Sequence, residues 1–310
     1  MKYIDRREFM KISSRWAALA SAGAVVPGIF TQAMAEPAPE IVVAKGNPPG
    51  AAARAAVEGL GGMARFVARG ARVVIKPNMS FAKGPEEAAN THPDVVRELA
   101  VMCREAGASS VLVLDNPLQN VEMCLERSRL KEACENIPGT GVEASSRRRD
   151  FREVSVPLGK SLKSTMIMKK VLEADVLIAA PVAKSHSGTG VSLSMKGMMG
   201  LIYNRREFHT SMDLNEAIVD LCTVLKPDLT VVDASRILSD GGPGGPGKVI
   251  RLDTVIASTD MVAADAMAVE LGTWYGRRFK GAQVAHIRMA HERGLGNMEF
   301  AGRSIKEVAV

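Results

Sequence analysis

A short apolar run that ends abruptly in a polar loop is the feature that most restricts the fold of this chain. Residues 176–180 (VLIAA) are uniformly apolar over the length of one strand, which is typical of a strand buried in a parallel sheet. Pro181 then ends the run, and a loop rich in hydroxyl, glycine and basic residues continues to Gly200. Ligands of open α/β sheets bind outside the carboxyl ends of the strands, so this central loop is a candidate site.

The rest of the chain repeats an alternation of strand and helix. Apolar runs typical of strands cover residues 41–44, 72–75, 110–114, 229–232 and 253–257. Helical patterns separate them at residues 51–69, 91–106, 121–134, 192–201, 213–225, 260–271 and 281–293. This alternation predicts right-handed parallel crossovers. We therefore expect an α/β fold with a mostly parallel open sheet, helices on both faces, and a small antiparallel elaboration in the middle, a hairpin of residues 154–156 and 164–168.

The N-terminal residues have the pattern of an export signal. Residues 5–11 (DRREFMK) contain a twin-arginine pair, a mildly apolar stretch covers residues 16–30, and residues 33–35 (AMA) offer a cleavage site. We expect residues 1–35 to be a signal peptide recognised by the twin-arginine export machinery, and residues 36–310 to be a single α/β domain in the periplasm. An uncleaved amphipathic anchor is the alternative. No other segment reaches transmembrane length, so we expect no stable membrane span after cleavage.

Charge and cysteine content restrict the classes of partner and cofactor. The formal net charge is +6, and the expected signal peptide carries about half of it. No basic stripe is interleaved with aromatic residues, so we expect no nucleic-acid partner. The four cysteines form no C-x-x-C motif, which leaves iron–sulfur and structural zinc sites of the usual spacing unsupported. Cys124 and Cys134 are either a disulfide or two free thiols.

Polar side chains stand at the ends of several expected strands. They are Lys76, Asn78, Asp115, Lys184, His186 and Asp233. Because the carboxyl ends of parallel strands meet along one edge of a sheet, these groups can converge although they are far apart in sequence. Strand ends are also polar simply because loops are hydrated, and this alternative applies to each residue taken alone. Together with the central loop, these residues predict a shared site.

The central loop supplies groups that suit an anion. Thr189, Ser192 and Ser194 add hydroxyl and backbone N–H donors just before an expected helix, whose first turn carries a partial positive charge. Lys196 adds a full positive charge. The residues that we expect to bind a small anionic ligand are Lys76, Asn78, Asp115, Thr189, Ser192, Ser194, Lys196 and Asp233.

If the protein is an enzyme, Lys184 and His186 are the candidates for proton transfer. Histidine titrates near neutral pH, so His186 could act as a general acid or base, or bind a metal. A loop histidine that is hydrogen-bonded to the backbone is the structural alternative. The residues identify no particular metal or cofactor.

Two other patterns are weaker candidates. Residues 242–248 match both a dinucleotide-binding motif and a P-loop, but two prolines interrupt the segment and a strand follows where both motifs require a helix. The segment is either a mobile lid over the site or a plain surface turn. His209, which follows the arginine pair at residues 205–206, is expected at the surface, and folding over the site is the alternative. His286 and His291 are five residues apart, which places them on different faces of a helix and argues against a metal pair.

Several short motifs occur together, and in the same order, in a known family. They are Lys76-Pro77-Asn78, His92-Pro93, Pro181 with Lys184-x-His186, Thr189-Gly190, Lys196 with Gly200, Gly242-Pro243-Gly244, and Asp260 with Asp265. In these motifs the chain, from about residue 41 to residue 271, resembles the domain-of-unknown-function 362 family. The central loop carries the most specific part of the resemblance, and the family has no established activity.

The chain also departs from the family pattern. Members usually have a lysine in place of Val182 and an asparagine in place of Gly197, which implies that part of the polar apparatus is altered here. Many members carry a ferredoxin-like cysteine cluster that is not found in this sequence, so electron transfer through such a cluster is not implied. More distantly, the order of strand, histidine, Gly/Ser loop and lysine is similar to that of the nickel-pincer lactate racemase family, as an analogy only.

Two functions from different classes fit these features. The first is an exported α/β protein that binds a small anionic ligand, with or without a metal or cofactor, at the carboxyl edge of a parallel sheet. The second is a non-catalytic subunit or maturation partner of an exported metalloenzyme or redox complex. The second function predicts an exposed apolar patch near the central loop, for which Met195, Met198 and Met199 are candidates unless they pack in the core.

Overall fold

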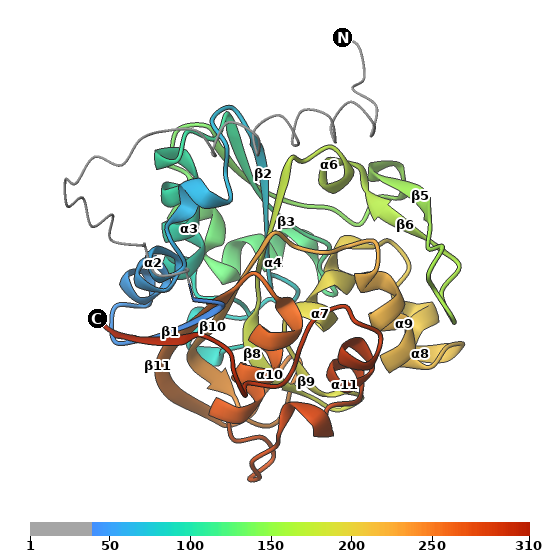
Figure 1. Ribbon diagram of the computed structural model, residues 1–310. Helices are drawn as coiled ribbons and strands as arrows, with labels where there is room; N and C mark the ends of the chain where they lie inside the picture. The colour runs from blue at the N-terminus through green and yellow to red at the C-terminus, as the bar shows by residue number, and fades with distance from the viewer. Residues whose placement is uncertain (1–38) are drawn as a thin grey trace, which may run out of the picture. The chain divides into compact units, whose positions relative to one another are not determined.

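A ten-stranded sheet organises the computed structural model, which describes residues 39–310 (Figure 1). Its strands are β1 (Ile41–Lys45), β2 (Arg72–Pro77), β3 (Ser110–Asp115), β4 (Thr140–Ala144), β7 (Val176–Ala180), β8 (Val182–His186), β9 (Gly190–Ser192), β10 (Leu229–Leu238), β11 (Val249–Ser258) and β12 (Ile305–Ala309). Eight of them follow the order β12-β1-β11-β10-β7-β2-β3-β4, while β8 also pairs with β10 and with β9. A separate two-stranded sheet contains β5 (Phe151–Ser155) and β6 (Ser164–Met168).

Most neighbouring strands of the large sheet are parallel. β4, β3, β2, β7 and β10 pair in parallel, as do β1 and β12, whereas β11 is antiparallel to both β1 and β10. This arrangement confirms the predicted α/β fold. β11 reverses direction because residues 239–248 are too few for the helical crossover that parallel strands need. The predicted hairpin exists as β5 and β6, but it forms its own sheet.

Helices cover both faces of the sheet. They are α2 (Pro49–Gly59), α3 (Pro93–Glu105), α4 (Val121–Ser128), α5 (Leu130–Cys134), α6 (Lys169–Leu172), α7 (Ser194–Gly197), α8 (Arg206–Thr210), α9 (Leu214–Cys222), α10 (Met261–Leu271) and α11 (Ala285–Glu292), with 3₁₀ turns at Met63–Arg65, Pro85–Glu87, Arg148–Asp150, Met198–Leu201 and Gly281–Gln283. Successive side chains of a strand point to opposite faces. Val73 and Ile75 therefore join the core formed with α2, α3 and α5, while Val74 joins the core formed with α9, α10 and α11.

The first helix is shorter than its alanine-rich sequence predicts. α2 ends at Gly59 instead of near residue 69, because Gly61 and Gly62 follow with φ of +104° and +84°. Glycine adopts this left-handed region at little cost, and two such residues in succession end the helix. The predicted helix at residues 192–201 is likewise divided into α7 and a 3₁₀ turn.

Three further expectations can be compared with the described residues. All four cysteines are free and buried, so Cys124 and Cys134 are two separate thiols. The methionines within residues 195–199 are buried in the core and offer no exposed patch to a partner. Over residues 39–310, no helix is both long enough and apolar enough to cross a bilayer. The predicted signal peptide, residues 1–35, lies outside the described residues.

Candidate functional site

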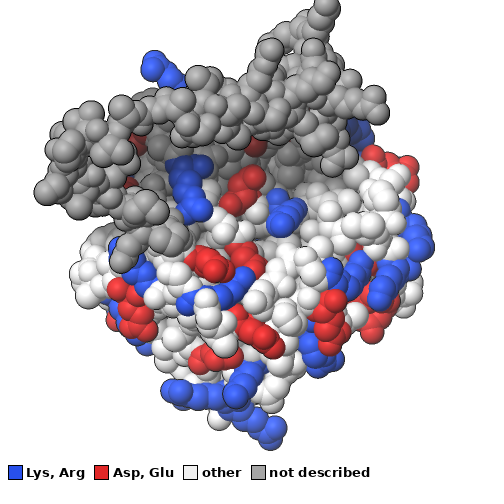
Figure 2. All heavy atoms as spheres, viewed as in Figure 1, with Lys and Arg blue, Asp and Glu red and all other residues white. Residues whose placement is uncertain are grey.

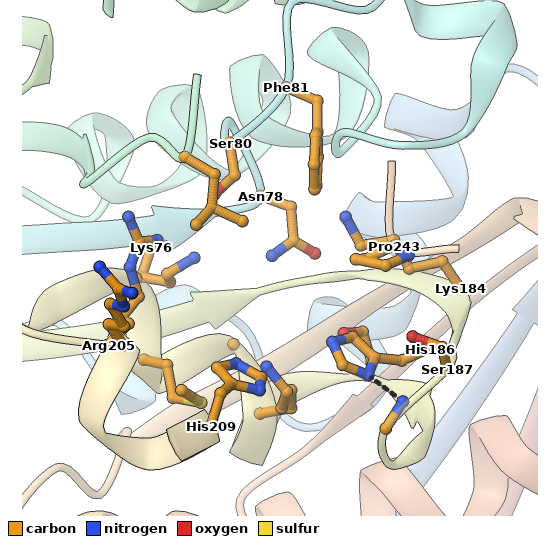
Figure 3. A pocket seen from close by; sticks show the side chains of 18 of the residues that line it. Lys76, Asn78, Ser80, Phe81, Lys184, His186, Ser187, Arg205, His209 and Pro243 are labelled. Carbon is orange, nitrogen blue, oxygen red and sulfur yellow. Dashed lines mark hydrogen bonds between the residues drawn. The ribbon is translucent and has the colours of Figure 1, made fainter. Parts of the chain in front are cut away.

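The chain segments at the carboxyl ends of β2 and β7 meet α7 around one cavity of about 550 Å³ (Figure 3). Six of the predicted site residues line it, namely Lys76, Asn78, Lys184, His186, Ser192 and Lys196. Lys76 lies in β2 and Asn78 directly after it, whereas Lys184 and His186 lie in β8, which continues the chain beyond Pro181. The volume is in the range of small-molecule sites.

The cavity lining is strongly basic. The lining side chains that carry or can carry positive charge are Lys76, Lys184, Lys196, Arg205, Arg206, His186 and His209. No Asp or Glu among residues 39–310 lines the cavity. By contrast, basic and acidic side chains are intermixed on the face of the described residues shown in Figure 2. This concentration of positive charge inside a concave site attracts anions.

Asp115, a predicted ligand-binding residue, lies behind the lining. Its carboxylate is 3.2 Å from Lys76 Nζ and accepts hydrogen bonds from the backbone N–H groups of Met79 and Asn116. Burial lowers the pKa of Lys76, and the carboxylate opposes that shift. A side chain in place of Gly200 would collide with both members of the pair. Asp115 therefore orients Lys76 and the chain after β2 without facing the cavity.

Lys184 is a buried amine, only 3% exposed. Its Nζ donates a hydrogen bond to the carbonyl oxygen of Ala89 and lies 4.7 Å from the centroid of the Phe81 ring. Burial lowers the pKa of Lys184 to about 7, and the positive charge of Lys76 adds to the shift. An amine with a pKa near neutrality can both accept and donate a proton at physiological pH.

Lys196 and Arg205 add two further cations. Burial, together with the positive charge of Arg205, lowers the pKa of Lys196 to about 8. Burial also lowers the pKa of Arg205, whose guanidinium donates to the carbonyl oxygen of Pro117 at 2.9 Å. Figure 3 shows Lys76 and Arg205 toward one end of the cavity and Lys184 toward the other. These cations repel one another, and a bound anion would relieve that repulsion.

His186 presents an N–H donor to the cavity. Its Nδ1 accepts a hydrogen bond from the backbone N–H of Gly188 at 3.0 Å, so the neutral ring carries its proton on Nε2. Burial and the positive charge of Lys196 lower the pKa of His186 to about 3, which keeps the ring neutral at physiological pH. The ring of His209 stacks against it, with the centroids 6.2 Å apart. His186 therefore suits hydrogen bonding to an anion better than accepting a proton.

Asn78 is oriented by hydrogen bonds to β8 and to Thr91, which lies in the loop before α3. Its Oδ1 accepts a hydrogen bond from the backbone N–H of Val182 at 3.0 Å, and the backbone N–H of Asn78 donates to Thr91 Oγ1 at 2.8 Å. Thr91 in turn donates to the carbonyl oxygen of Ala180 at 2.7 Å. Because Oδ1 is used in this way, the Nδ2 amide of Asn78 is left as a donor toward the cavity (Figure 3).

Ser194 contacts a buried carboxylate and does not line the cavity. Its Oγ and N–H both donate to Asp265 of α10, at 2.6 and 2.9 Å, and the N–H of Met195 donates to the same carboxylate at 2.9 Å. The helix start that we expected to bind an anion is therefore already capped by a side chain of the protein. Burial raises the pKa of Asp265 to about 7, against the effect of these hydrogen bonds. Asp265 thus fixes α7, which carries Lys196.

Asp233 and Thr189 also lie outside the cavity lining. Asp233 forms an ion pair with Arg236 at 2.7 Å and accepts a hydrogen bond from the backbone N–H of His92 at 2.8 Å. Thr189 donates to the carbonyl oxygen of Val191 at 2.9 Å, within the turn that joins β8 and β9. The polar groups of both side chains are thus used to hold neighbouring segments together.

The sequence does not point to several of the residues that line the cavity. They are Ser80, Phe81, Leu118, Tyr203, Asn204, Arg205 and Arg206. His209, predicted at the surface, is exposed but lines the cavity as well. The one sequence signal for this segment is the adjacent pair of arginines at residues 205–206, shortly after the central loop.

The glycine–proline loop between β10 and β11 borders the cavity. Pro243 lines it, and the N–H of Gly242 donates to Ser185 Oγ at 2.9 Å. A Cβ atom at Gly244 would lie 2.7 Å from the ring of Phe81, so only glycine permits this approach. The loop is therefore packed against β8 and Phe81 as a rim of the site.

Metal-ligating side chains do not gather in the described part of the chain. Over residues 39–310, no three His, Cys, Asp or Glu side chains are placed to hold a metal ion. His286 is buried with Nδ1 3.3 Å from Asn215 Oδ1, and burial lowers the pKa of His286 to about 3. Neither His286 nor His291 lines the cavity. The cavity donors are amines, guanidinium groups, amides, hydroxyls and imidazoles.

Several solved structures resemble this chain distantly, and two of them illustrate the similarity. The lactate racemase apoprotein from Thermoanaerobacterium thermosaccharolyticum matches with a TM-score of 0.44 and 12% identity, over 71% of this chain and 54% of that protein. A protein from Thermotoga maritima matches with a TM-score of 0.38 and 12% identity, over 61% of this chain and 51% of its own. The chain thus spans about half the length of each of these two proteins, at a similarity too low to bear on function.

Sequence comparison is more informative about the family. A thylakoid-associated protein of Synechocystis sp. is 25% identical over 230 residues, which cover 71% of this chain and 69% of that protein. The family model described as a domain of unknown function, DUF362, matches residues 73–270, more than half of the chain. That match includes the six predicted residues that line the cavity. The chain therefore belongs to the domain-of-unknown-function family DUF362.

Proposed function

We propose that the protein binds a small anionic ligand in the cavity between β2, β8 and α7. The observation that carries this proposal is the cavity lining, which contains Lys76, Lys184, Lys196, Arg205 and Arg206 but no Asp or Glu among the described residues. Asp115, which lies behind the lining, forms an ion pair with Lys76 and leaves the other cations without a carboxylate partner in the cavity. A buried cation without a counter-ion is unfavourable, so an anion in the cavity would stabilise the folded protein. Phosphate-like and carboxylate groups both suit this set of donors.

Lys184 is the better of the two candidates for proton transfer. Its pKa of about 7 allows the amine to exchange a proton at neutral pH, whereas His186, with a pKa of about 3, is neutral there. In this proposal Lys184 accepts or donates the proton, and His186 Nε2–H and Asn78 Nδ2 hold the anion. The positions of these side chains and the pKa values of Lys184 and His186 support these roles.

Calorimetric titration with sulfate tests the proposal, because sulfate stays a dianion across the pH range in which proteins fold. We expect sulfate to bind in the cavity and Lys196→Met to weaken the binding about tenfold or more. Lys226→Met is the matched control, since Lys226 is exposed and does not line the cavity. Absence of sulfate binding, or an equal loss in both variants, would contradict the proposal.

We also propose that the protein is exported by the twin-arginine pathway and acts in the periplasm. The support is the DRREFMK run and the small-residue motif at residues 33–35. Cell fractionation tests this: the wild type should be recovered from the periplasm with Glu36 as its first residue, and replacing Arg6 and Arg7 by lysine should retain it in the cytoplasm. Periplasmic recovery of that variant would contradict the proposal.

A further inference from the structure

The basic cavity also has apolar side chains at its mouth. Within residues 39–310, the large apolar side chains that are more than a third exposed are Leu118, Met123, Leu158, Tyr203, Val249, Tyr275, Ile305 and Val310. Two of these eight, Leu118 at 59% and Tyr203 at 37%, line this cavity. Isolated exposed apolar residues are ordinary on protein surfaces, but two that converge on one basic cavity suggest a shared role.

The backbone holds both residues in place. The N–H of Leu118 donates to the carbonyl oxygen of Ser80 at 3.1 Å, beside the end of β2. The N–H of Tyr203 donates to the carbonyl oxygen of Met166 at 2.9 Å, and its ring packs against Phe151 with centroids 5.4 Å apart. The backbone of both residues and the ring of Tyr203 are therefore preorganised, which lowers the entropic cost of binding an apolar group against them.

Phe81 connects the apolar and the basic parts of the cavity. Its ring lies 4.7 Å from Lys184 Nζ and lines the cavity on the side away from His209 (Figure 3). Asn90 fixes the backbone of Phe81 through two hydrogen bonds, from Phe81 N–H to Oδ1 and from Nδ2 to the Phe81 carbonyl oxygen. An apolar group beside Phe81 would therefore lie next to an anion held by Lys184.

We infer that the ligand carries an apolar group, aromatic or short aliphatic, attached to its anionic group. This inference rests on the proposed function, because it assigns the cations to the anionic end of the same ligand. The apolar end would contact Phe81, Leu118 and Tyr203 at the mouth, and the anionic end would reach Lys76, Lys184 and Lys196. Burial of an apolar group against preformed apolar side chains adds affinity in proportion to the area removed from water.

A pair of sulfonates isolates the apolar contribution, because methanesulfonate and benzenesulfonate carry the same single negative charge at every pH of interest. Calorimetry on the mature protein should show benzenesulfonate binding about tenfold or more tightly than methanesulfonate. The double variant Leu118→Ser, Tyr203→Ser should lose most of this preference and keep its affinity for sulfate. Leu158→Ser is the matched control, since Leu158 is 69% exposed but does not line the cavity.

The outcomes separate this inference from the proposed function. If sulfate binds but benzenesulfonate binds no more tightly than methanesulfonate, the inference fails and the anion site remains. If no anion binds, the proposed function fails. If the double variant keeps the preference, or changes the oligomeric state on gel filtration instead of the preference, the apolar mouth serves another purpose and the inference is overturned. Equal loss of preference in Leu158→Ser would also overturn it.

Discussion

Lys184 and His186 lie two residues apart on β8, yet their surroundings give them different chemistry. Both are buried beside other cations, and burial disfavours the charged form of each. The amine starts from a pKa of 10.5 and is lowered to about 7, whereas the imidazole starts from 6.5 and is lowered to about 3. The same physical effect therefore makes Lys184 titratable near neutrality and keeps His186 neutral.

Lys184→Met should stabilise the protein while weakening sulfate binding. Between pH 7 and 10.5 the unfolded chain binds more protons at Lys184 than the folded protein does, so stability rises with pH across this window. Below pH 7 Lys184 is charged in the folded protein as well, and the burial of that charge lowers the free energy of unfolding by its full amount. We expect the variant to gain about 1–4 kcal/mol in the free energy of unfolding at pH 6, and to show a flatter rise toward pH 10.

Urea unfolding at pH 6 and at pH 9 measures both effects of this substitution. Lys226→Met again serves as the control, because its exposed side chain is not expected to change either quantity. A Lys184→Met protein that is less stable than the wild type at pH 6 would contradict the assigned cost of the buried charge.

At the scale of elements, the contact between α7 and α10 positions part of the cavity. Asp265 of α10 accepts three hydrogen bonds from Ser194 and Met195 at the start of α7. One turn of α7 carries Lys196 into the cavity lining. Asp265, which lies outside the cavity, thus determines the position of Lys196, one of the cations that line the cavity.

Asp265→Asn should lower both stability and sulfate affinity. An amide offers one acceptor oxygen in place of two, so at least one of the three donors loses its partner, at a cost of about 1–3 kcal/mol. Thermal unfolding and sulfate titration measure the two effects. Asp220→Asn is the matched control: Asp220 is also buried, lies outside the cavity lining and accepts backbone hydrogen bonds, but its partners Ser161 and Leu162 are not in α7. It should lose stability and keep sulfate affinity, and an unchanged affinity in Asp265→Asn would contradict the positioning role.

At the scale of the whole molecule, the sheet brings together cations from distant parts of the chain. Lys76 lies near the end of β2, and Lys184 lies in β8, which follows the neighbouring parallel strand β7. Lys196 comes from α7, and Arg205 comes from the segment before α8. Their joint effect is a site whose charge depends on pH, because Lys184 and Lys196 titrate at about 7 and 8. Because these cations come from separate segments, we expect the protein to bind anions only when the chain is folded.

Sulfate affinity should fall by about tenfold or more between about pH 6 and pH 9. Over this range the free protein loses protons from the two lysines, whereas bound sulfate favours their charged forms and raises both pKa values. Binding near pH 7.5 should consequently take up protons. Titrations in two buffers of different ionisation enthalpy measure this uptake, and affinity that is constant or rises with pH would contradict the lysine assignment.

The sequence by itself determined the architecture and brought together part of what lines the cavity. Short apolar runs separated by amphipathic helices predict parallel strands, and the carboxyl ends of parallel strands share an edge. This reasoning placed Lys76, Asn78, Lys184, His186 and Lys196 together without any knowledge of the contacts. It succeeds because backbone hydrogen bonding fixes strand direction and register, and neither depends on the details of side-chain packing.

Only the tertiary structure decided which polar groups remain available to a ligand. Ser194 and Asp233 stand at the predicted places, but Asp265 and Arg236 engage them, because a buried polar group must find a partner within reach. Arg205 lines the cavity because of the path that the chain takes between α7 and α8. No local sequence pattern predicts that path. Side-chain partners depend on residues distant in sequence, so the availability of each donor follows from packing alone.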